Sequence, residues 1–477
     1  INHIKKIFRY KITSLLIFGL LLSVSACKKF VQVGPPVTSL NQDNIYENDK
    51  TAIASLTGIY IQLSNNNNLD LSIYPGLSSD ELTLYSGVTS NQELIDFYKN
   101  SLKASTSYGS NYWGKLYNVI FNINAAIEGL SSSSKLTPEI KQKLLGEAYF
   151  LRGYVYFYLT NLFGDVPLAL TTEYTTNSNL VKSPKDLVFG QILSDLNQAK
   201  GLLSPSYLDA SLIKVSTERV RPVQSAASAM LARTFLYKGD YINAEKEASL
   251  VLANTSSYDT VSLNNVFIKN SKETIWSIQP VINVGNTADA RLFIIPGTGP
   301  STTYWASLSS NMLSAFETGD KRLVNWVSSV TVSGKTYFFP YKYKVVSTVP
   351  VTTSSEYLVV LRLGEQYLIR AEARAQLGNL AGALNDLNLI RKRARLSAST
   401  ATTKTDILTA IIRERQVELF AEGAHRWLDL KRTNTIDNVM STVTSQKGGV
   451  WNSSWALYPI GQEILDRSPS LSQNPGY

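Results

Sequence analysis

Three glutamates, Glu414, Glu418 and Glu422, recur every fourth residue near the carboxyl end of the chain. In a helical segment their carboxylates would lie on one face, because residues four apart are neighbours on a helix. Carboxylates this close repel one another, and the repulsion can raise the pKa of one of them enough for it to act as a general acid. The pattern is therefore compatible with a secreted hydrolase that uses paired carboxylates, such as a glycoside hydrolase.

A structural role for the same glutamates is the competing interpretation, since arginine is plentiful around them. The candidate partners are Arg391, Arg393, Arg395, Arg415, Arg426 and Arg432. Ion-paired in this way, the carboxylates would belong to the frame of the protein. We favour this interpretation and predict that the chain is not an enzyme and has no catalytic residues.

The sequence has too few histidine and cysteine residues for the other common catalytic and metal-binding sites. The chain has two histidines, His3 and His425, and a single cysteine, Cys27. His3 and Cys27 lie in the amino-terminal segment described below, which leaves one histidine for the body. This is too few for a Cys/His zinc site or a Cys-His dyad, and it allows at most a single His-based pair. We therefore predict no metal site and no cofactor, and a fold held by its core without disulfides.

Aromatic side chains in loops are the better candidates for binding chemistry. A flat ring matches the apolar face of a sugar, while amides and arginines satisfy its hydroxyls. Tyr74 precedes a Pro-Gly pair, Tyr85 precedes a Ser-Gly pair, and the pair Tyr304-Trp305 follows a Gly- and Pro-rich stretch. We predict these four residues as ligand contacts, with Arg291 and Asn91 as weaker polar candidates. Trp113, Trp276 and Trp427 are assigned to the core.

The first 26 residues have the layout of a secretory signal. Four basic residues are followed by an apolar run over residues 15–22 and then by small residues. The run is shorter than the roughly 20 residues that cross a bilayer, which argues against a transmembrane anchor. Residues 24–27, Val-Ser-Ala-Cys, form a lipobox, so we expect cleavage before Cys27 and acylation of that residue. The acyl chains would anchor the protein in a membrane.

Charge argues against nucleic acid as a partner. The net charge of +9 falls to +5 when the four basic residues of the signal are removed. The remaining Lys and Arg residues are spread along the chain rather than clustered, so we predict no nucleic-acid binding.

The body is predicted to be mainly helical, with apolar residues at spacings of three and four. Such stripes cover residues 52–63, 113–130, 144–162 and 188–203, and the third ends at a Gly-Asp-Val-Pro stop. Residues 232–248 and 371–387 share one spacing of small residues around a glycine, which is typical of tetratricopeptide helical hairpins. Residues 256–364 are rich in Ser, Thr, Val, Gly and Pro, with strands expected at 273–279, 337–346 and 357–363.

Four blocks of sequence resemble the SusD/RagB family of outer-membrane nutrient-uptake lipoproteins. They are residues 147–168 (EAYFLRGYVYFY to FGDVPL), 361–394 (LRLGEQYLIRAEA to NLIRKRA), 414–432 (ERQVELFAEGAHRWLDLKR), and YPI at 458–460 with the final QNPGY. With the lipobox, they occur in the family's order along nearly the whole chain. The resemblance implies an α-rich SusD-like fold with tetratricopeptide-like hairpins, long loops and a few short strands.

The resemblance also implies a function. Proteins of this family are non-enzymatic and lipid-anchored at the outer face of the outer membrane. They cap a TonB-dependent (SusC-like) transporter and deliver to it a captured ligand, most often an oligosaccharide and sometimes a peptide. One departure is the absence of acidic residues directly after Cys27, which weakens the expectation that the protein faces outward. A tetratricopeptide-type scaffold that binds only protein is the alternative.

The expected organisation has four parts. Residues 1–26 are the signal peptide, and 27–41 are the lipid anchor and tether. Residues 42–255 form an N-terminal SusD-like helical part. Residues 256–477 form a C-terminal SusD/RagB part with a loop-rich insert and a helical hairpin.

Overall fold

The computed structural model describes residues 44–281, 286–346 and 354–477. The predicted signal peptide, the predicted acylation site at Cys27 and the predicted tether lie outside these ranges. Within them the fold is mainly α with short strands, as the sequence predicts, and the strands form four two-stranded sheets. None of the helices in these ranges is both long enough and apolar enough to cross a membrane.

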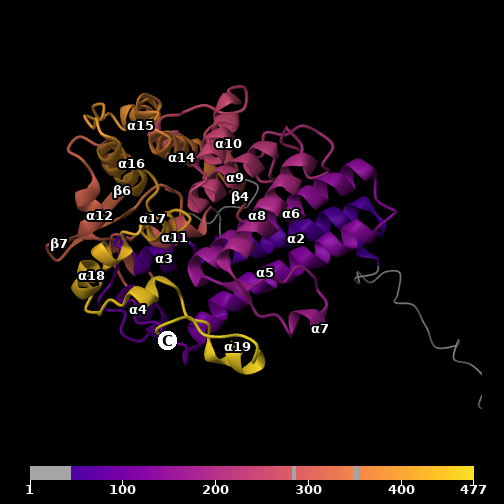
Figure 1. The fold of residues 1–477 in the computed structure, drawn as a ribbon. Helices are drawn as coiled ribbons and strands as arrows, with labels where there is room; N and C mark the ends of the chain where they lie inside the picture. Colours follow the sequence, from indigo (N-terminus) through magenta and orange to yellow (C-terminus); the bar gives the residue numbers. More distant parts are fainter. Residues whose placement is uncertain (1–43, 282–285, 347–353) are drawn as a thin grey trace, which may run out of the picture.

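Four long helices of the N-terminal half follow the four predicted stripes: α2 (Asp49–Asn65), α5 (Ser107–Ser132), α6 (Pro138–Phe163) and α8 (Lys185–Leu202). Helix α6 lies between α5 and α8 (Figure 1). It is enclosed on all sides, and nearly every residue from Gly146 to Phe163 is buried. It ends at Gly164, whose φ of +79° is one that other residues rarely adopt.

The two predicted helical hairpins are present and lie against each other. The first is α9 (Gln224–Lys238) with α10 (Tyr241–Ala253), and the second is α14 (Leu363–Gln376) with α15 (Leu380–Arg393). Helix α10 packs on α14, and Ala232, Ala248 and Ala373 meet in one apolar cluster where small side chains permit close approach. The helices α6, α8, α9, α10, α14 and α15 thus pack in sequence order as one stack (Figure 1). The loop-rich insert between α10 and α14 does not interrupt this packing order.

Short antiparallel strands organise the loop-rich insert. Strand β4 (Thr274–Ile278) pairs with β8 (Leu358–Arg362), and β6 (Val327–Val332) pairs with β7 (Lys335–Pro340). Two of the three predicted strands are therefore confirmed. The third, expected at 337–346, is wrong in its second half, since β7 ends at Pro340.

Two further ladders join distant segments. Strand β1 (Leu82–Leu84) pairs with β5 (Ala306–Leu308), and β2 (Val166–Pro167) pairs with β3 (Lys182–Ser183). The remaining helices are η1 (Ile45–Glu47), η2 (Asn68–Asp70), α3 (Tyr74–Ser78), α4 (Gln92–Lys99), α7 (Tyr174–Asn177), η3 (Leu263–Asn265), α11 (Ala288–Phe293), α12 (Ser310–Ala315), α13 (Lys321–Asn325), α16 (Lys404–Glu418), α17 (His425–Arg432), α18 (Ile436–Gln446), η5 (Ser453–Ala456) and α19 (Gln462–Arg467). The C-terminal segment returns to the N-terminal half, with α17 against α3 and α19 against α5.

Substitutions at two helical glycines, one on α6 and one on α8, test the close packing of these helices. A Cβ at Gly153 would lie 2.9 Å from Leu196 Cγ, whereas a Cβ at Gly190 meets nothing within 4 Å. We expect Gly190→Ala to raise the free energy of unfolding by about 0.5–1 kcal/mol through helix propensity. Gly153→Ala should instead lower it by about 1–3 kcal/mol through overpacking. Denaturant titration measures both, and equal effects at the two sites would contradict the packing.

Candidate functional site

Two of the predicted ligand contacts, Tyr85 and Tyr304, are brought together by the pairing of β1 with β5. The backbone N–H of Tyr85 donates to the carbonyl of Trp305 at 2.8 Å, which continues the ladder by one residue. Both tyrosines are partly exposed, and the Ser86-Gly87 turn beside them is open to solvent. We call the surface formed by residues 85–87 and 301–304 the corner.

Local geometry fixes each ring at the corner. A Cβ at Gly87 would lie 2.4 Å from Tyr85 Cε1, so the tyrosine ring occupies space that only glycine leaves. On the other strand, the Ser301 hydroxyl accepts from the Tyr304 N–H at 3.2 Å, and the Ser301 N–H donates to the Tyr304 carbonyl at 3.2 Å. The two rings are therefore held on short, hydrogen-bonded turns.

The other two predicted contacts are largely packed into the protein. Trp305 is 7% exposed and belongs to the main core. Tyr74 begins α3, and its ring stacks on Phe97 with centroids 4.2 Å apart. Burial raises the pKa of Tyr74 strongly, and the charges of Asp70 and Glu93 add to the effect. Trp305 thus packs in the core directly next to the corner in sequence. Tyr74 packs in an aromatic cluster beside α4.

The weaker polar candidates have structural partners. Asn91 caps α4 by accepting from the Leu94 N–H at 3.2 Å. Arg291 donates to the carbonyl of Asn286 at 3.1 Å, and burial lowers its pKa. The side chain of Asn286 accepts in turn from the backbone N–H groups of residues 355 and 356, which ties two loops of the insert together.

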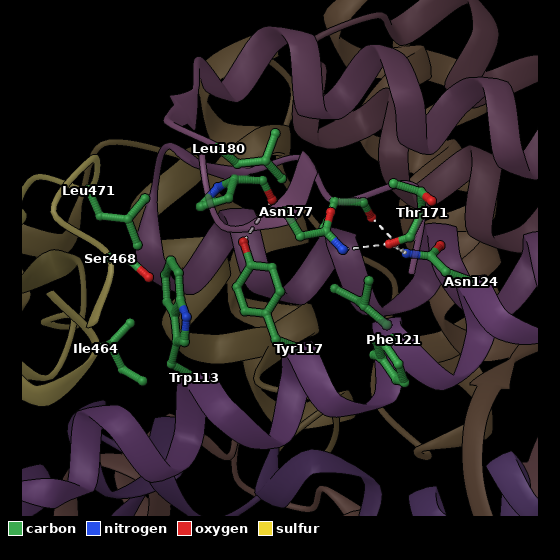
Figure 2. Close-up of a pocket in the computed structure, with 13 residues that line it drawn as sticks. Trp113, Tyr117, Phe121, Asn124, Thr171, Asn177, Leu180, Ile464, Ser468 and Leu471 are labelled. Carbon is green, nitrogen blue, oxygen red and sulfur yellow. Dashed lines mark hydrogen bonds between the residues drawn. The ribbon is translucent and has the colours of Figure 1, made fainter. Parts of the chain in front are cut away.

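Sequence reasoning missed two concave regions. A cavity of about 440 Å³ is lined by Tyr60, Arg221, Lys269 and Tyr357, among others. Its two cationic side chains are already paired, Arg221 with Glu147 at 2.7 Å and Lys269 with Glu218 at 2.8 Å, and its Asp209 carboxylate accepts from the Ser211 hydroxyl. The second region is a groove of about 240 Å³ along α5 (Figure 2). Its signal in the sequence was Phe121, an aromatic residue that falls outside the apolar stripe of that helix.

The three glutamates that suggested acid catalysis are buried in ion pairs. Helix α16 ends at Glu418, so Glu422 lies on the following turn, and the prediction of one continuous helical face is wrong. The reason is a tight turn in which Ala421, Gly423 and Ala424 all have positive φ. The turn directs the Glu422 carboxylate onto Arg362 and Lys342.

Glu418 is the centre of this network. Its carboxylate contacts Arg362 at 2.6 Å, Arg322 at 3.0 Å and also Arg393. Burial by itself would raise the pKa of the Glu418 carboxyl, but the three guanidinium groups lower it well below its ordinary value. A carboxylate held ionised in this way serves as a structural anion and has no proton to give as an acid.

The expected arginine partners are partly right. Arg391 contacts Glu414 at 3.3 Å, and Arg393 contacts Glu418, as predicted. Arg415 and Arg432 instead pair with Asp429, both at 2.7 Å, and Arg426 pairs with Asp80 at 2.7 Å. Arg322 and Arg362, which sequence reasoning missed, come from the insert and carry much of the network.

The described residues contain no group of three or more His, Cys, Asp or Glu side chains placed to hold a metal ion. His425 is buried, and burial followed by the positive charges of Arg233 and Arg415 lowers its pKa well below the ordinary value. A neutral, enclosed imidazole of this kind belongs to the core.

Family models match both ends of the chain. Residues 302–477 match the SusD family, and residues 29–236 match a SusD-like family described as starch-binding and associating with the outer membrane. The chain belongs to the SusD/RagB family. This confirms the resemblance seen in the four sequence blocks.

Relatives and solved structures agree with this membership. SusD-like protein P2 of Formosa agariphila is 24% identical, with 98% of this chain and all of the relative covered. A SusD superfamily protein of Bacteroides vulgatus has the same fold, with a TM-score of 0.77 and 21% identity over 90% of this chain and 99% of that one. A structure described as a laminarin-binding SusD-like protein has a TM-score of 0.75 and 22% identity over 90% of this chain and all of that one.

Glu418→Gln tests the structural role of the buried network. The substitution leaves three arginines without their shared anion, and we expect a loss of about 3–5 kcal/mol in the free energy of unfolding at neutral pH. Because folding lowers the pKa of Glu418, this contribution is present above its ordinary value of 4.5 and is lost as the pH falls below it. The difference between wild type and variant should therefore shrink in acid.

The matched control is Glu463→Gln on α19, whose half-exposed side chain lies 3.6 Å from Arg467. A surface pair of this kind is worth less than about 1 kcal/mol. Similar losses for the two variants in urea titrations would contradict the central role of Glu418.

Proposed function

We propose that this chain is an outer-membrane lipoprotein that binds an oligosaccharide and delivers it to a TonB-dependent (SusC-like) transporter. The observation that carries the proposal is the match of both ends of the chain to SusD-family models, one of them described as starch-binding. Similar folds described as laminarin-binding and as a surface glycan-binding protein of Bacteroides uniformis support a glycan as the ligand. A peptide is the other ligand class that the family resemblance implies.

The proposed role is binding without catalysis. The carboxylates that would serve a glycoside hydrolase are engaged by arginines, with Glu414 on Arg322 at 2.7 Å and Glu422 on Arg362 at 2.8 Å. This supports a non-enzymatic protein over the hydrolase alternative.

The corner is the proposed contact surface for the glycan. Tyr85 and Tyr304 offer two partly exposed rings on adjacent turns, and exposed hydroxyl residues at 86, 302 and 303 flank them. Rings supply apolar contact with sugar faces, and hydroxyl groups can pair with those of the sugar. We assign supporting roles to Trp305 and Tyr74, which hold the corner and the neighbouring α3 in place.

The proposed location rests on the amino-terminal segment. Acylation of Cys27 would anchor the protein, and residues 28–41 would tether the body to the membrane. Orientation toward the outside is part of the proposal and is consistent with capture of nutrients from the medium.

A glycan- and peptide-array screen of the full-length protein in detergent tests the binding role. We expect an oligosaccharide hit whose dissociation constant, measured by calorimetry, rises three- to tenfold in Tyr85→Ala and in Tyr304→Ala. Such a change corresponds to about 0.5–1.5 kcal/mol for one lost ring contact. Ile242→Ala, which removes a 68% exposed isoleucine on α10, is the control.

Trp305→Ala is unsuitable for this purpose, because it would open a cavity in the core and report on stability. An array with no hit among glycans and peptides would favour the alternative of a scaffold that binds only protein. Binding that survives both tyrosine substitutions would move the site away from the corner.

Cys27→Ser tests the anchor. Without the thiol no acyl chain can be attached, and about 0.8 kcal/mol of membrane affinity is lost for each methylene that would have been buried. We expect the variant to move from the membrane pellet to the soluble fraction, with the acyl mass absent from the amino-terminal peptide. Lys28→Gln serves as the control and should stay with the membrane. A Cys27→Ser protein that still sediments with membranes would contradict lipid anchoring.

A further inference from the structure

The groove on α5 and the corner are formed by different segments of the chain. Its floor is α5, one side is the loop from Pro167 to Leu180 with α7, and the other side is the C-terminal segment from Ile464 to Leu471 (Figure 2). Its volume of about 240 Å³ gives room for one monosaccharide ring.

Three side chains of α5 form a wall of aromatic rings along the floor of the groove. Trp113, Tyr117 and Phe121 are four residues apart on α5, so their rings follow one another at a rise of about 6 Å along the helix (Figure 2). The first two rings pack together with centroids 4.8 Å apart, and the Tyr117 hydroxyl donates to the Pro167 carbonyl at 2.7 Å. The wall is therefore held in place before any ligand arrives.

Phe121 is the exposed member of the line. Its side chain is 49% exposed, although a phenylalanine gains free energy by burial. It lines the groove, where a ring-shaped ligand would cover its exposed face. An exposed aromatic beside two ordered aromatics is an arrangement suited to stacking on the flat face of a sugar.

Hydrogen-bonding groups lie across from the rings. Asn177 donates its amide N–H to the Thr171 carbonyl at 2.7 Å, which fixes the amide orientation, and its side-chain oxygen is buried with no partner among the described residues. The Ser468 hydroxyl points toward Trp113 across the groove (Figure 2). An unpaired buried acceptor is unfavourable, and a ligand hydroxyl that donated to it would recover part of the lost free energy.

The charge of the residues that line the groove narrows the class of ligand that the groove can bind. None of the described residues that line the groove is acidic or basic. An anionic sugar would leave its carboxylate or sulfate without a counter-charge in a partly enclosed space, which is costly. An apolar peptide side chain would fill the groove but would leave the oxygen of Asn177 unpaired.

We propose that the groove binds one neutral pyranose unit, stacked on Phe121 and Tyr117 and hydrogen-bonded by Asn177 and Ser468. This is a second carbohydrate site in addition to the corner. It extends the proposed function to a second contact on the same glycan or on a neighbouring one, and it can be tested independently of the corner.

The test uses the full-length protein in detergent with a double substitution, Tyr85→Ala and Tyr304→Ala, so that the corner no longer contributes. The probes are the methyl glycosides of glucose, galactose and mannose, with glucuronic acid and an N-acetylated leucine amide as comparisons. We expect saturation-transfer NMR to show binding of at least one neutral glycoside in this background. Phe121→Ala and Asn177→Leu should each weaken that binding at least fivefold.

Phe338→Ala is the matched control, since it removes a phenylalanine that is 37% exposed on β7. Thermal unfolding of every variant checks that the body remains folded. Absence of binding by all three neutral glycosides would overturn the inference. So would binding that Phe121→Ala and Asn177→Leu leave unchanged, or a preference for glucuronic acid or the leucine amide. None of these results depends on whether the corner binds glycan.

Discussion

The buried carboxylate of Glu418 joins parts of the chain that are far apart in sequence. Arg322 comes from α13, Arg362 from the end of β8 and Arg393 from the end of α15, and all three contact this one side chain. A buried charge is tolerated only when it is paired and hydrogen-bonded, so each arginine requires the anion as much as the anion requires them. The insert is thereby fixed to the second hairpin by charge, where its short strands alone would hold it weakly. The position of the corner depends on this attachment, because β5 belongs to the same insert.

The helical part of the fold could be predicted because its determinants are local. Apolar spacing gave the four helices of the N-terminal half, and the positive φ of Gly164, Gly239 and Gly378 is the conformation that a glycine at a helix end suggests. The stacking of the two hairpins on each other could not be predicted, because more than 100 residues separate them in the sequence. It depends on Ala248 and Ala373, whose small side chains let α10 and α14 approach closely across the intervening insert.

The candidate site was predictable only in part, and the limit is again non-local. The sequence identified Tyr85 and Tyr304 as loop aromatics, but their proximity arises from a ladder between residues more than 200 positions apart. Tyr304 lies on the turn before β5 and is partly exposed, whereas Trp305, the next residue, is buried directly before the strand begins. The groove on α5 had an even weaker signal, because its second and third sides come from residues 167–180 and 464–471. Only Phe121, an aromatic residue off the apolar stripe, indicated that this helix presents a ring to solvent.

A protein that hands its ligand to a transporter must bind without holding too tightly. Each ring contact contributes about 0.5–1.5 kcal/mol, so a site built from two rings and a few hydroxyl groups releases its ligand quickly. Two such weak sites on one rigid body can still retain a polymer, since binding at one raises the effective concentration at the other. The polymer can then be released one site at a time as its sugar units leave, and no single strong contact has to break. A rigid helical frame with small, separate aromatic surfaces is suited to this kind of capture and release, whereas one deep cavity would favour retention.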